Sequence, residues 1–199
     1  GCTESKIRWL KNNLPQLYDA LRSILLPHDC INCVLTSQKV MEFDDASGTD
    51  MLDIRSRGWS TEPLSAIDAD TKMQKYLPPF VKSSEFIGGT NHQFSIKYGM
   101  PEGIPVTAGG DDNMMAAIGT GNVILGRLTI RLGSSGTVFV FSEKPIIDPE
   151  GNIAAFCSST DGWLPLLCPM NCTLGTELLH APLGVELDDF DKVIAKSEV

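Results

Sequence analysis

The stretch AGGDDNMMAAIGTG, residues 108–121, constrains the fold of this chain more than any other. The preceding GIPVT is short, apolar and β-branched, which is typical of a buried strand, while MMAAI at 114–118 favours a helix. Glycines, aspartates and an asparagine therefore lie at a strand-to-helix corner. In open α/β sheets such corners border a crevice, where the helix start offers backbone N–H groups without intrahelical partners. The sequence thus predicts an α/β fold with a polar site at this corner.

Composition narrows the class of protein. The chain has 199 residues, 42% of them hydrophobic, so it can bury a substantial core as one large domain or as parts of two. Its formal net charge of −9 argues against a nucleic-acid surface. No apolar run reaches the length of a membrane span, and no secretory leader opens the sequence. We therefore expect a cytoplasmic protein that binds neither nucleic acid nor membrane.

The predicted secondary structure changes near residue 120. Before it, mixed α/β structure is predicted, with helices at 5–14, 15–24, 63–67 and 92–98, a short strand at 25–29 leading into a helix that ends at Val34, and a polar loop and ribbon at 36–60. After it, strands are predicted at 127–132, 138–141, 153–156 and 163–167, followed by helices at 173–179 and 188–196. A boundary between 1–120 and 121–199 follows.

Two cysteine pairs raise an alternative. Cys30 and Cys33 have CxxC spacing, and Cys168 and Cys172 lie four apart, so a zinc or redox protein has to be considered. Reduced thiols acting as small apolar side chains are the simpler interpretation, because a zinc site needs four converging ligands and the two pairs lie about 135 positions apart. The three histidines of the chain match no nucleophile or metal arrangement, so no role is assigned to them.

The adjacent acids at the corner allow two interpretations. A carboxylate at a helix start is commonly an N-cap, which accounts for one acid and for Asn113. A general base or a ligand of magnesium-bound water is the functional interpretation of the other acid, and the neighbouring glycines would clear space for a substrate. Asp111 and Asp112 also repel each other, which raises the pKa of at least one of them.

A second polar segment is the GSSGT sequence between the strands predicted at 127–132 and 138–141. Glycines let backbone N–H groups approach an anion, and hydroxyl groups add donors without bulk, so this hairpin tip suits phosphate oxygens. Hairpin tips also contain glycine and serine for turn geometry alone, so the feature is a weak signal by itself. The candidate phosphate contacts are Gly133, Ser134, Ser135, Gly136 and Thr137.

Several segments together carry a resemblance to a known family. GCTESKIRWLKNN at the start has Gly1, Thr3, Lys6, Ile7, Trp9, Leu10, Asn12 and Asn13 at the spacing of the first signature of the FGGY carbohydrate kinases. The matching segments that follow, in the family's order and spacing, are LLPHDCINCVLT, DDASGTDMLDIRSRGWS, PVTAGGDDNMMAAIGTGNV and LGSSGTVFVFSEKP. The chain resembles the middle of such a kinase over essentially its whole length, and is most similar to the members that phosphorylate D-xylulose.

The resemblance implies a two-domain kinase of the actin and hexokinase type, with an RNase H-like mixed sheet in each domain. Residues 1–120 would end the first domain, which binds sugar, and 121–199 would begin the nucleotide-binding second domain. Asp112 would be the general base, with Asn113 as a second substrate contact, and 133–137 would hold ATP phosphates. Magnesium would accompany ATP, near Asp112. The expected partners are ATP and a sugar, D-xylulose first and glycerol, ribulose, gluconate or a fucose-type sugar as alternatives, and a homodimer is compatible with this expectation.

The chain also departs from the family pattern. Asp111 stands where the family has glycine, and Arg131 replaces a small residue before the phosphate hairpin. The upstream D-x-G-T phosphate loop and the downstream G-G-G adenosine motif are not in this sequence, so we expect a fragment that is inactive alone. These departures leave a second hypothesis open, a kinase-like protein that binds ligands or acts as a scaffold without catalysis.

Overall fold

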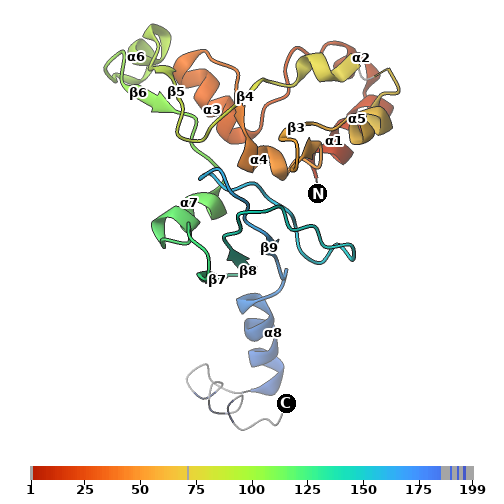
Figure 1. Cartoon of the computed structure of the whole chain (residues 1–199), viewed down its shortest axis with the longest axis vertical. Coiled ribbons are helices and arrows are strands. Elements are labelled where there is room, and N and C mark those ends of the chain that lie inside the picture. Colours follow the sequence, from red (N-terminus) through yellow and green to blue (C-terminus); the bar gives the residue numbers. More distant parts are fainter. Residues whose placement is uncertain (1, 71, 185–188, 190–191, 193–194, 196–199) are drawn as a thin grey trace.

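The structure is a computed structural model that describes residues 2–70, 72–184, 189, 192 and 195. Most helices of the first hundred residues gather at one end of an elongated molecule, a β-hairpin with one helix lies in the middle, and a last helix projects from the other end (Figure 1). Within the described residues, no helix combines the length and apolar character that crossing a bilayer requires.

Helices and short strands are mixed along the chain up to residue 119, in agreement with the mixed α/β structure that the sequence predicts. The α-helices are α1 (Thr3–Asn13), α2 (Pro15–Asp19), α3 (Pro27–Thr36), α4 (Phe43–Ser47), α5 (Thr61–Ile67), α6 (His92–Tyr98), α7 (Asp112–Gly119) and α8 (Thr173–Leu183), and a 3-10 turn, η1, covers Lys72–Tyr76.

The strands form four small sheets. Strands β1 (Met41–Glu42) and β4 (Phe80–Val81) are parallel, whereas β2 (Leu52–Asp53) pairs with β3 (Gly58–Trp59), and β5 (Phe86–Gly89) with β6 (Pro105–Thr107), in antiparallel fashion. The last sheet is antiparallel, in the order β7 (Leu128–Leu132), β8 (Gly136–Val140), β9 (Leu166–Leu167). This arrangement is a mixed α/β fold.

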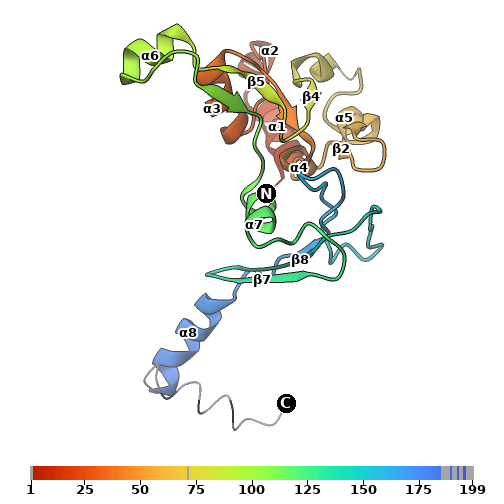
Figure 2. The same ribbon diagram turned by 60° about the vertical axis from the view of Figure 1, so that its left-hand side comes forward.

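Two separate apolar cores hold the molecule together. The first lies between α1, α2, α5 and η1, and its buried members are Ile7, Tyr18, Met51, Leu64, Ile67, Met73 and Leu77. The second lies between α7 and the β7-β8-β9 sheet, and its buried members are Met114, Ala117, Phe139, Leu164 and Leu166. The corner helix α7 is therefore packed on the sheet that carries the GSSGT hairpin (Figure 2).

Strand β7 exposes its apolar side chains and turns its polar side chains toward the protein. Its apolar side chains Leu128, Ile130 and Leu132 are 59%, 58% and 71% exposed. The alternate residues point the other way, because Thr129 bonds to Asn122 beside the end of α7 and Arg131 bonds to Asp112 at its start. The polar face of β7 thus covers α7, and this position turns Arg131 toward the corner.

The structure corrects part of the predicted pattern. No strand forms at 25–29, because Pro27 begins α3 and the Asp29 carboxylate accepts a hydrogen bond from the Leu26 N–H, which caps the helix. The helix predicted over 15–24 ends at Asp19. The β2-β3 hairpin is the ribbon predicted within 36–60, but this segment also contains α4, which is not predicted from the sequence. Of the strands predicted at 153–156 and 163–167, only Leu166–Leu167 is a strand, with isolated bridges beside it.

Other predictions are confirmed. The helices at 5–14 and 92–98 and the strands at 127–132 and 138–141 correspond to α1, α6, β7 and β8, and the helix at 173–179 corresponds to α8. The helix predicted at 188–196 lies outside the described residues except for single positions. The domain boundary near residue 120 stays a prediction.

Candidate functional site

The predicted strand-to-helix corner forms between β6 and α7. Gly109 has φ +80°, a conformation that side chains with a Cβ rarely adopt. At Gly110 an added Cβ would lie 2.6 Å from Asp44 Oδ2, 2.8 Å from Met115 Cε and 2.9 Å from Ser159 Oγ. The two glycines therefore serve close packing and backbone conformation inside the corner itself.

Asp111 is the N-cap of α7. Its Oδ1 accepts hydrogen bonds from the Asn113 backbone N–H at 2.8 Å and from Asn113 Nδ2 at 3.2 Å. Burial raises the pKa of the Asp111 carboxyl, the hydrogen bond from the Asn113 N–H opposes this, and the nearby Asp112 charge adds to the rise. One of the two acids is thus a structural cap, as the simpler interpretation of the sequence requires.

Asp112 points in a different direction from its neighbour. Its side chain is 68% exposed, and its two oxygens accept hydrogen bonds from Asn113 Nδ2 at 2.9 Å and from Arg131 Nη1 at 2.9 Å. A carboxylate at the surface of a strand-to-helix corner is open to a substrate hydroxyl and has the oxygen ligands that Mg²⁺ accepts. The structure therefore leaves Asp112 accessible for chemistry.

The GSSGT segment is a hairpin tip between β7 and β8, next to α7 (Figure 2). Arg131 and Thr137 face each other at its base; Arg131 contacts Asp112, and Thr137 Oγ1 lies 3.4 Å from Asn113 Oδ1. Residues predicted for base and phosphate chemistry are therefore neighbours. Thr137 is buried against α7, so it contacts Asn113 instead of pointing away from the protein.

The N–H groups of both glycines of this tip already have protein partners. Gly133 donates to Ser135 O at 3.1 Å, and Gly136 donates to Pro169 O at 2.9 Å. The start of α8 lies against the same tip, since the Cys172 and Thr173 N–H groups donate to Ser134 O and Gly133 O. The glycines hold the shape of the tip, which leaves Ser134 and Ser135 as the more suitable phosphate donors.

Hydrogen bonds from side chains of α3 and α4 hold the backbone of the corner in place. The Ala108 carbonyl accepts hydrogen bonds from His28 Nε2 at 2.6 Å and from Asn32 Nδ2 at 2.7 Å, both on α3. Asp44, fully buried on α4, accepts from the Asp111 N–H at 3.1 Å, from Ser83 Oγ at 2.9 Å and from Ser159 Oγ. The sequence alone assigns no role to these side chains, although His28 and Asn32 lie in the LLPHDCINCVLT segment and Asp44 begins the DDASGTDMLDIRSRGWS segment, both of which carry the family resemblance.

Four side chains in the same region could together hold a cation. His28, Asp29, Glu42 and Asp45 each offer a donor atom, and these atoms lie within 4.8 Å of one another. Burial raises the pKa of Glu42 to about 9 and that of Asp29 to about 6. The hydrogen bond with Asp45 at 3.2 Å raises the pKa of His28 to about 9, against the opposing effect of burial. Protonation of His28 therefore places a positive charge beside the Asp45 carboxylate.

The zinc alternative finds no support in the geometry. All six cysteines are free thiols, and among the described residues none of them belongs to a group that could hold a metal. Cys30 and Cys33 lie on α3, whereas Cys168 and Cys172 flank the hairpin tip. The two pairs thus belong to different parts of the molecule.

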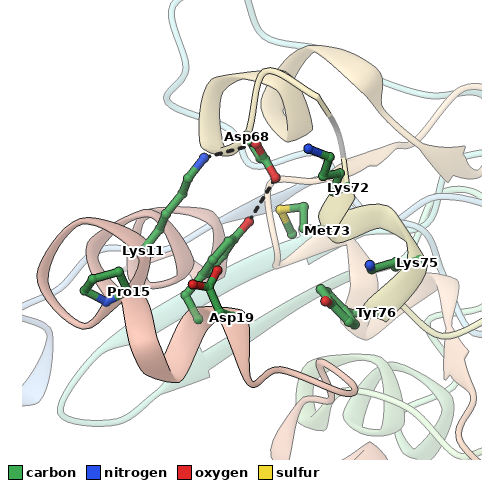
Figure 3. A pocket seen from close by; sticks show the side chains of 9 residues that line it. Lys11, Pro15, Asp19, Asp68, Lys72, Met73, Lys75 and Tyr76 are labelled. Atoms are coloured by element: carbon green, nitrogen blue, oxygen red, sulfur yellow. Dashed lines mark hydrogen bonds and ion pairs between the residues drawn. The ribbon is translucent and has the colours of Figure 1, made fainter.

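One cavity lies beside the corner, and another of similar size lies away from it. One of about 470 Å³ borders Gly109 and α7, and its lining includes Met115 and Ile118 of α7 together with Ser83, Ser84, Thr107, Ser159 and Thr160. Another, of about 460 Å³, lies between α1, α2 and η1 (Figure 3). There Lys11 Nζ pairs with Asp68 at 3.1 Å and Tyr18 donates to the same carboxylate, so this second cavity shares no residue with the corner.

Comparison with known proteins covers the whole chain. Residues 1–119 match the N-terminal domain of the FGGY family of carbohydrate kinases. Xylulose kinase of Haemophilus influenzae is 36% identical over 199 residues, which is 100% of this chain and 40% of that protein. Xylulose kinase of Streptomyces rubiginosus is 33% identical over 184 residues, 92% of this chain and 37% of that protein.

Solved structures agree with this likeness. A "xyloylose kinase" from Brucella ovis superposes with a TM-score of 0.86 at 26% identity, over 99% of this chain and 40% of that chain. A ligand-bound xylulose kinase from Lactobacillus acidophilus gives a TM-score of 0.87 at 20% identity over the same shares of the two chains. This chain therefore spans about 40% of the length of the relatives that it matches.

Proposed function

Because the chain belongs to the FGGY family of carbohydrate kinases, we propose that the complete protein transfers the γ-phosphoryl group of ATP to a sugar hydroxyl. The observation that carries this proposal is the placement of Asp112. Its exposed carboxylate lies at the N-terminus of α7, and Arg131 from the base of the GSSGT hairpin contacts it at 2.9 Å. A base and a phosphate-binding tip thus adjoin the same space.

In the proposed reaction Asp112 accepts the proton of the attacking hydroxyl. The sugar oxygen then forms its new bond to the γ-phosphorus of ATP while the bond to the β-γ bridging oxygen breaks, which releases ADP and leaves the proton on Asp112. Asn113, bonded to both Asp111 and Asp112, keeps the carboxylate in place beside the substrate. Such transfers depend mainly on positioning and on neutralisation of charge.

The phosphate side of the site would come from the hairpin tip. Ser134 and Ser135 supply donors to the ATP phosphates, while Gly133, Gly136 and Thr137 fix the shape of the tip through their own contacts. Magnesium bound with ATP supplies charge neutralisation on the phosphates, and the oxygens of Asp112 have the chemistry to contact its hydration shell. Two RNase H-like domains, divided near residue 120, would close around sugar and nucleotide.

D-Xylulose is the proposed acceptor, with D-xylulose 5-phosphate as product. The curated relatives that support this choice are named xylulose kinase and are 36% and 33% identical to this chain. Gluconate kinase of Lactobacillus acidophilus and glycerol kinase of Plasmodium falciparum share the fold at 20% and 18% identity, so these acceptors belong in the same assay. The cytoplasm is the location that fits ATP-dependent sugar metabolism, and a homodimer stays part of the proposal.

The test is turnover by the complete protein with D-xylulose and magnesium-ATP, in a coupled assay for ADP. Asp112→Asn should lower kcat by about 10² to 10⁴, because it removes the proton acceptor. Asp111→Asn is the matched control, since asparagine caps a helix as well as aspartate does. Retained turnover in Asp112→Asn, or no turnover with any of the sugars named above, would contradict the proposal.

A second candidate function is ligand binding without catalysis. The observation that favours it is that both carboxylate oxygens of Asp112 are engaged, one by Asn113 and one by Arg131. Calorimetry with magnesium-ATP separates the two functions. Binding in the micromolar range without any ADP release in the presence of sugar would favour the non-catalytic protein.

A further inference from the structure

Arg131 is the one charged side chain on the two strands that carry the GSSGT tip. The segment from Leu128 to Val140 reads LTIRLGSSGTVFV, so its only formal charge is this guanidinium. Strand alternation turns Arg131 to the side of α7, and it lies two residues before the tip glycine Gly133. Its side chain is 54% exposed, so the guanidinium reaches the corner across open space.

The contact of Arg131 with Asp112 has a geometric consequence that rests on the proposed function. If Asp112 accepts the proton of the attacking hydroxyl, that oxygen lies about 2.7 Å from the carboxylate. The phosphorus under attack lies about 3 to 3.5 Å beyond it. Arg131 Nη1 is 2.9 Å from the same carboxylate, so the transferring phosphoryl group comes within reach of the flexible arginine side chain.

We propose that Arg131 contacts the γ-phosphoryl group of bound ATP directly, and that it exchanges Asp112 for this partner when ATP arrives. The exchange is favourable because an exposed arginine-carboxylate pair is weak. A guanidinium binds phosphate oxygens through two parallel hydrogen bonds, and a terminal phosphate carries more charge than one carboxylate.

This exchange would also release the base. Without ATP, one oxygen of Asp112 accepts from Arg131 and the other from Asn113. Once Arg131 moves to the phosphate, the oxygen that it leaves can accept the hydrogen bond of the sugar hydroxyl. Arg131 then lies beside the developing charge of the transfer and offsets the negative charge that Asp111 and Asp112 place next to the phosphates.

The experiment compares three variants of the complete protein in steady-state kinetics. Arg131→Gln should lower kcat/KM for ATP by about 10² to 10³, within the range seen when a charge-stabilising group of a phosphoryl-transfer site is removed. Arg131→Lys should recover about tenfold of this loss, because lysine keeps the positive charge but lacks the paired N–H donors of the guanidinium. Arg127→Gln is the control, since the Arg127 guanidinium donates to the Gly121 carbonyl and not to a group of the proposed site, so this variant should change kcat/KM less than about twofold.

Binding of ADP separates a phosphate contact from a structural role. ADP lacks the γ-phosphoryl group, so calorimetry should give the same Kd for ADP in Arg131→Gln and in the unmodified protein. If this variant weakens ADP and ATP equally, Arg131 supports the hairpin and the inference is wrong. If Asp112→Asn abolishes turnover while Arg131→Gln turns over normally or faster, the inference also fails, but the proposed function stands. Turnover that survives Asp112→Asn would instead refute the proposed function.

Discussion

Carboxylates of the same chemical type lie on both sides of the Gly109–Gly110 corner, in opposite environments. Asp44 is fully buried and accepts hydrogen bonds from the Asp111 backbone and from the hydroxyls of Ser83 and Ser159. Asp112 is 68% exposed, and its contacts are with side chains that can move. Burial therefore separates the two acids: the buried one fixes the backbone of the corner, and the exposed one is accessible from solvent.

The exposed position of Asp112 depends on the buried contacts that hold the backbone of the corner. Asp112 can project from the corner in one direction because its neighbour Asp111 is held through its own backbone N–H by Asp44, and because Ala108 is held by His28 and Asn32. A site of this kind needs a rigid support beneath the reactive group. The comparison therefore predicts large stability effects on the buried side and functional effects with small stability effects on the exposed side.

The largest stability effect is expected from Asp44→Ala. The substitution leaves buried donors without an acceptor, so we expect a loss of about 2 to 4 kcal/mol in the free energy of unfolding. Urea denaturation followed by circular dichroism measures this loss. Asp112→Ala is the matched control on the exposed side and should change stability by less than about 1 kcal/mol. Equal losses in both variants would remove the distinction between the two carboxylates.

Next comes Gly110→Ala. The new Cβ would meet Asp44, Met115 and Ser159 at 2.6 to 2.9 Å, so neighbours must move, at a cost of about 1 to 3 kcal/mol. Gly119→Ala is a control of opposite sign, because nothing lies within 4 Å of its Cβ position at the end of α7 and alanine favours the helix by about 0.5 to 1 kcal/mol. Thermal melts of both variants should shift in opposite directions.

The ionisable groups His28 and Glu42 should also make the free energy of unfolding depend on pH. The folded-state pKa of His28, about 9, lies above its ordinary value of 6.5, so its contribution is complete below pH 6.5 and is lost as the pH rises through 9. Glu42, raised from 4.5 to about 9, likewise binds its proton more tightly when folded, so its effect has the same sign. We therefore expect the free energy of unfolding to fall as the pH rises from 6.5 to 9, because both groups then lose protons that the folded state binds more tightly than the unfolded chain does.

Denaturation curves across that pH range measure the effect, and two histidine variants sharpen it. His28→Gln should flatten the dependence, whereas His92→Gln should leave it unchanged, because His92 pairs with Glu102 at the exposed surface. A stability that rises from pH 6.5 to 9 would contradict the proposed protonation of this group.

The smallest effect is expected for the exposed ion pair. Arg131→Gln removes the bond to Asp112, but both side chains are more than half exposed, so stability should change by less than about 0.5 kcal/mol. Differential scanning calorimetry measures the change. A loss above about 2 kcal/mol would mean that the pair supports the fold, and a large kinetic effect could then no longer be ascribed to ligand contact.

Much of the local structure follows from the sequence because its causes are local. Asn91 and Gly99 bound the helix predicted at 92–98 through an N-cap and a left-handed C-terminal residue. The alternation around GSSGT gives the β7-β8 hairpin. The strand predicted at 25–29 is wrong for an equally local reason, since Pro27 and Asp29 begin a helix there.

The corner, its two acids and the GSSGT tip can be predicted from the amino-acid sequence alone, because helix propensity, capping and turn geometry act over a few residues. Tertiary packing was needed to show which acid is a cap and which is exposed, and that Arg131 lies beside Asp112. It also brought His28, Asp44, Ser83 and Ser159 under the corner. Those contacts join segments far apart in the chain, and no local rule fixes them, since they depend on how the helices and the hairpin sheet pack.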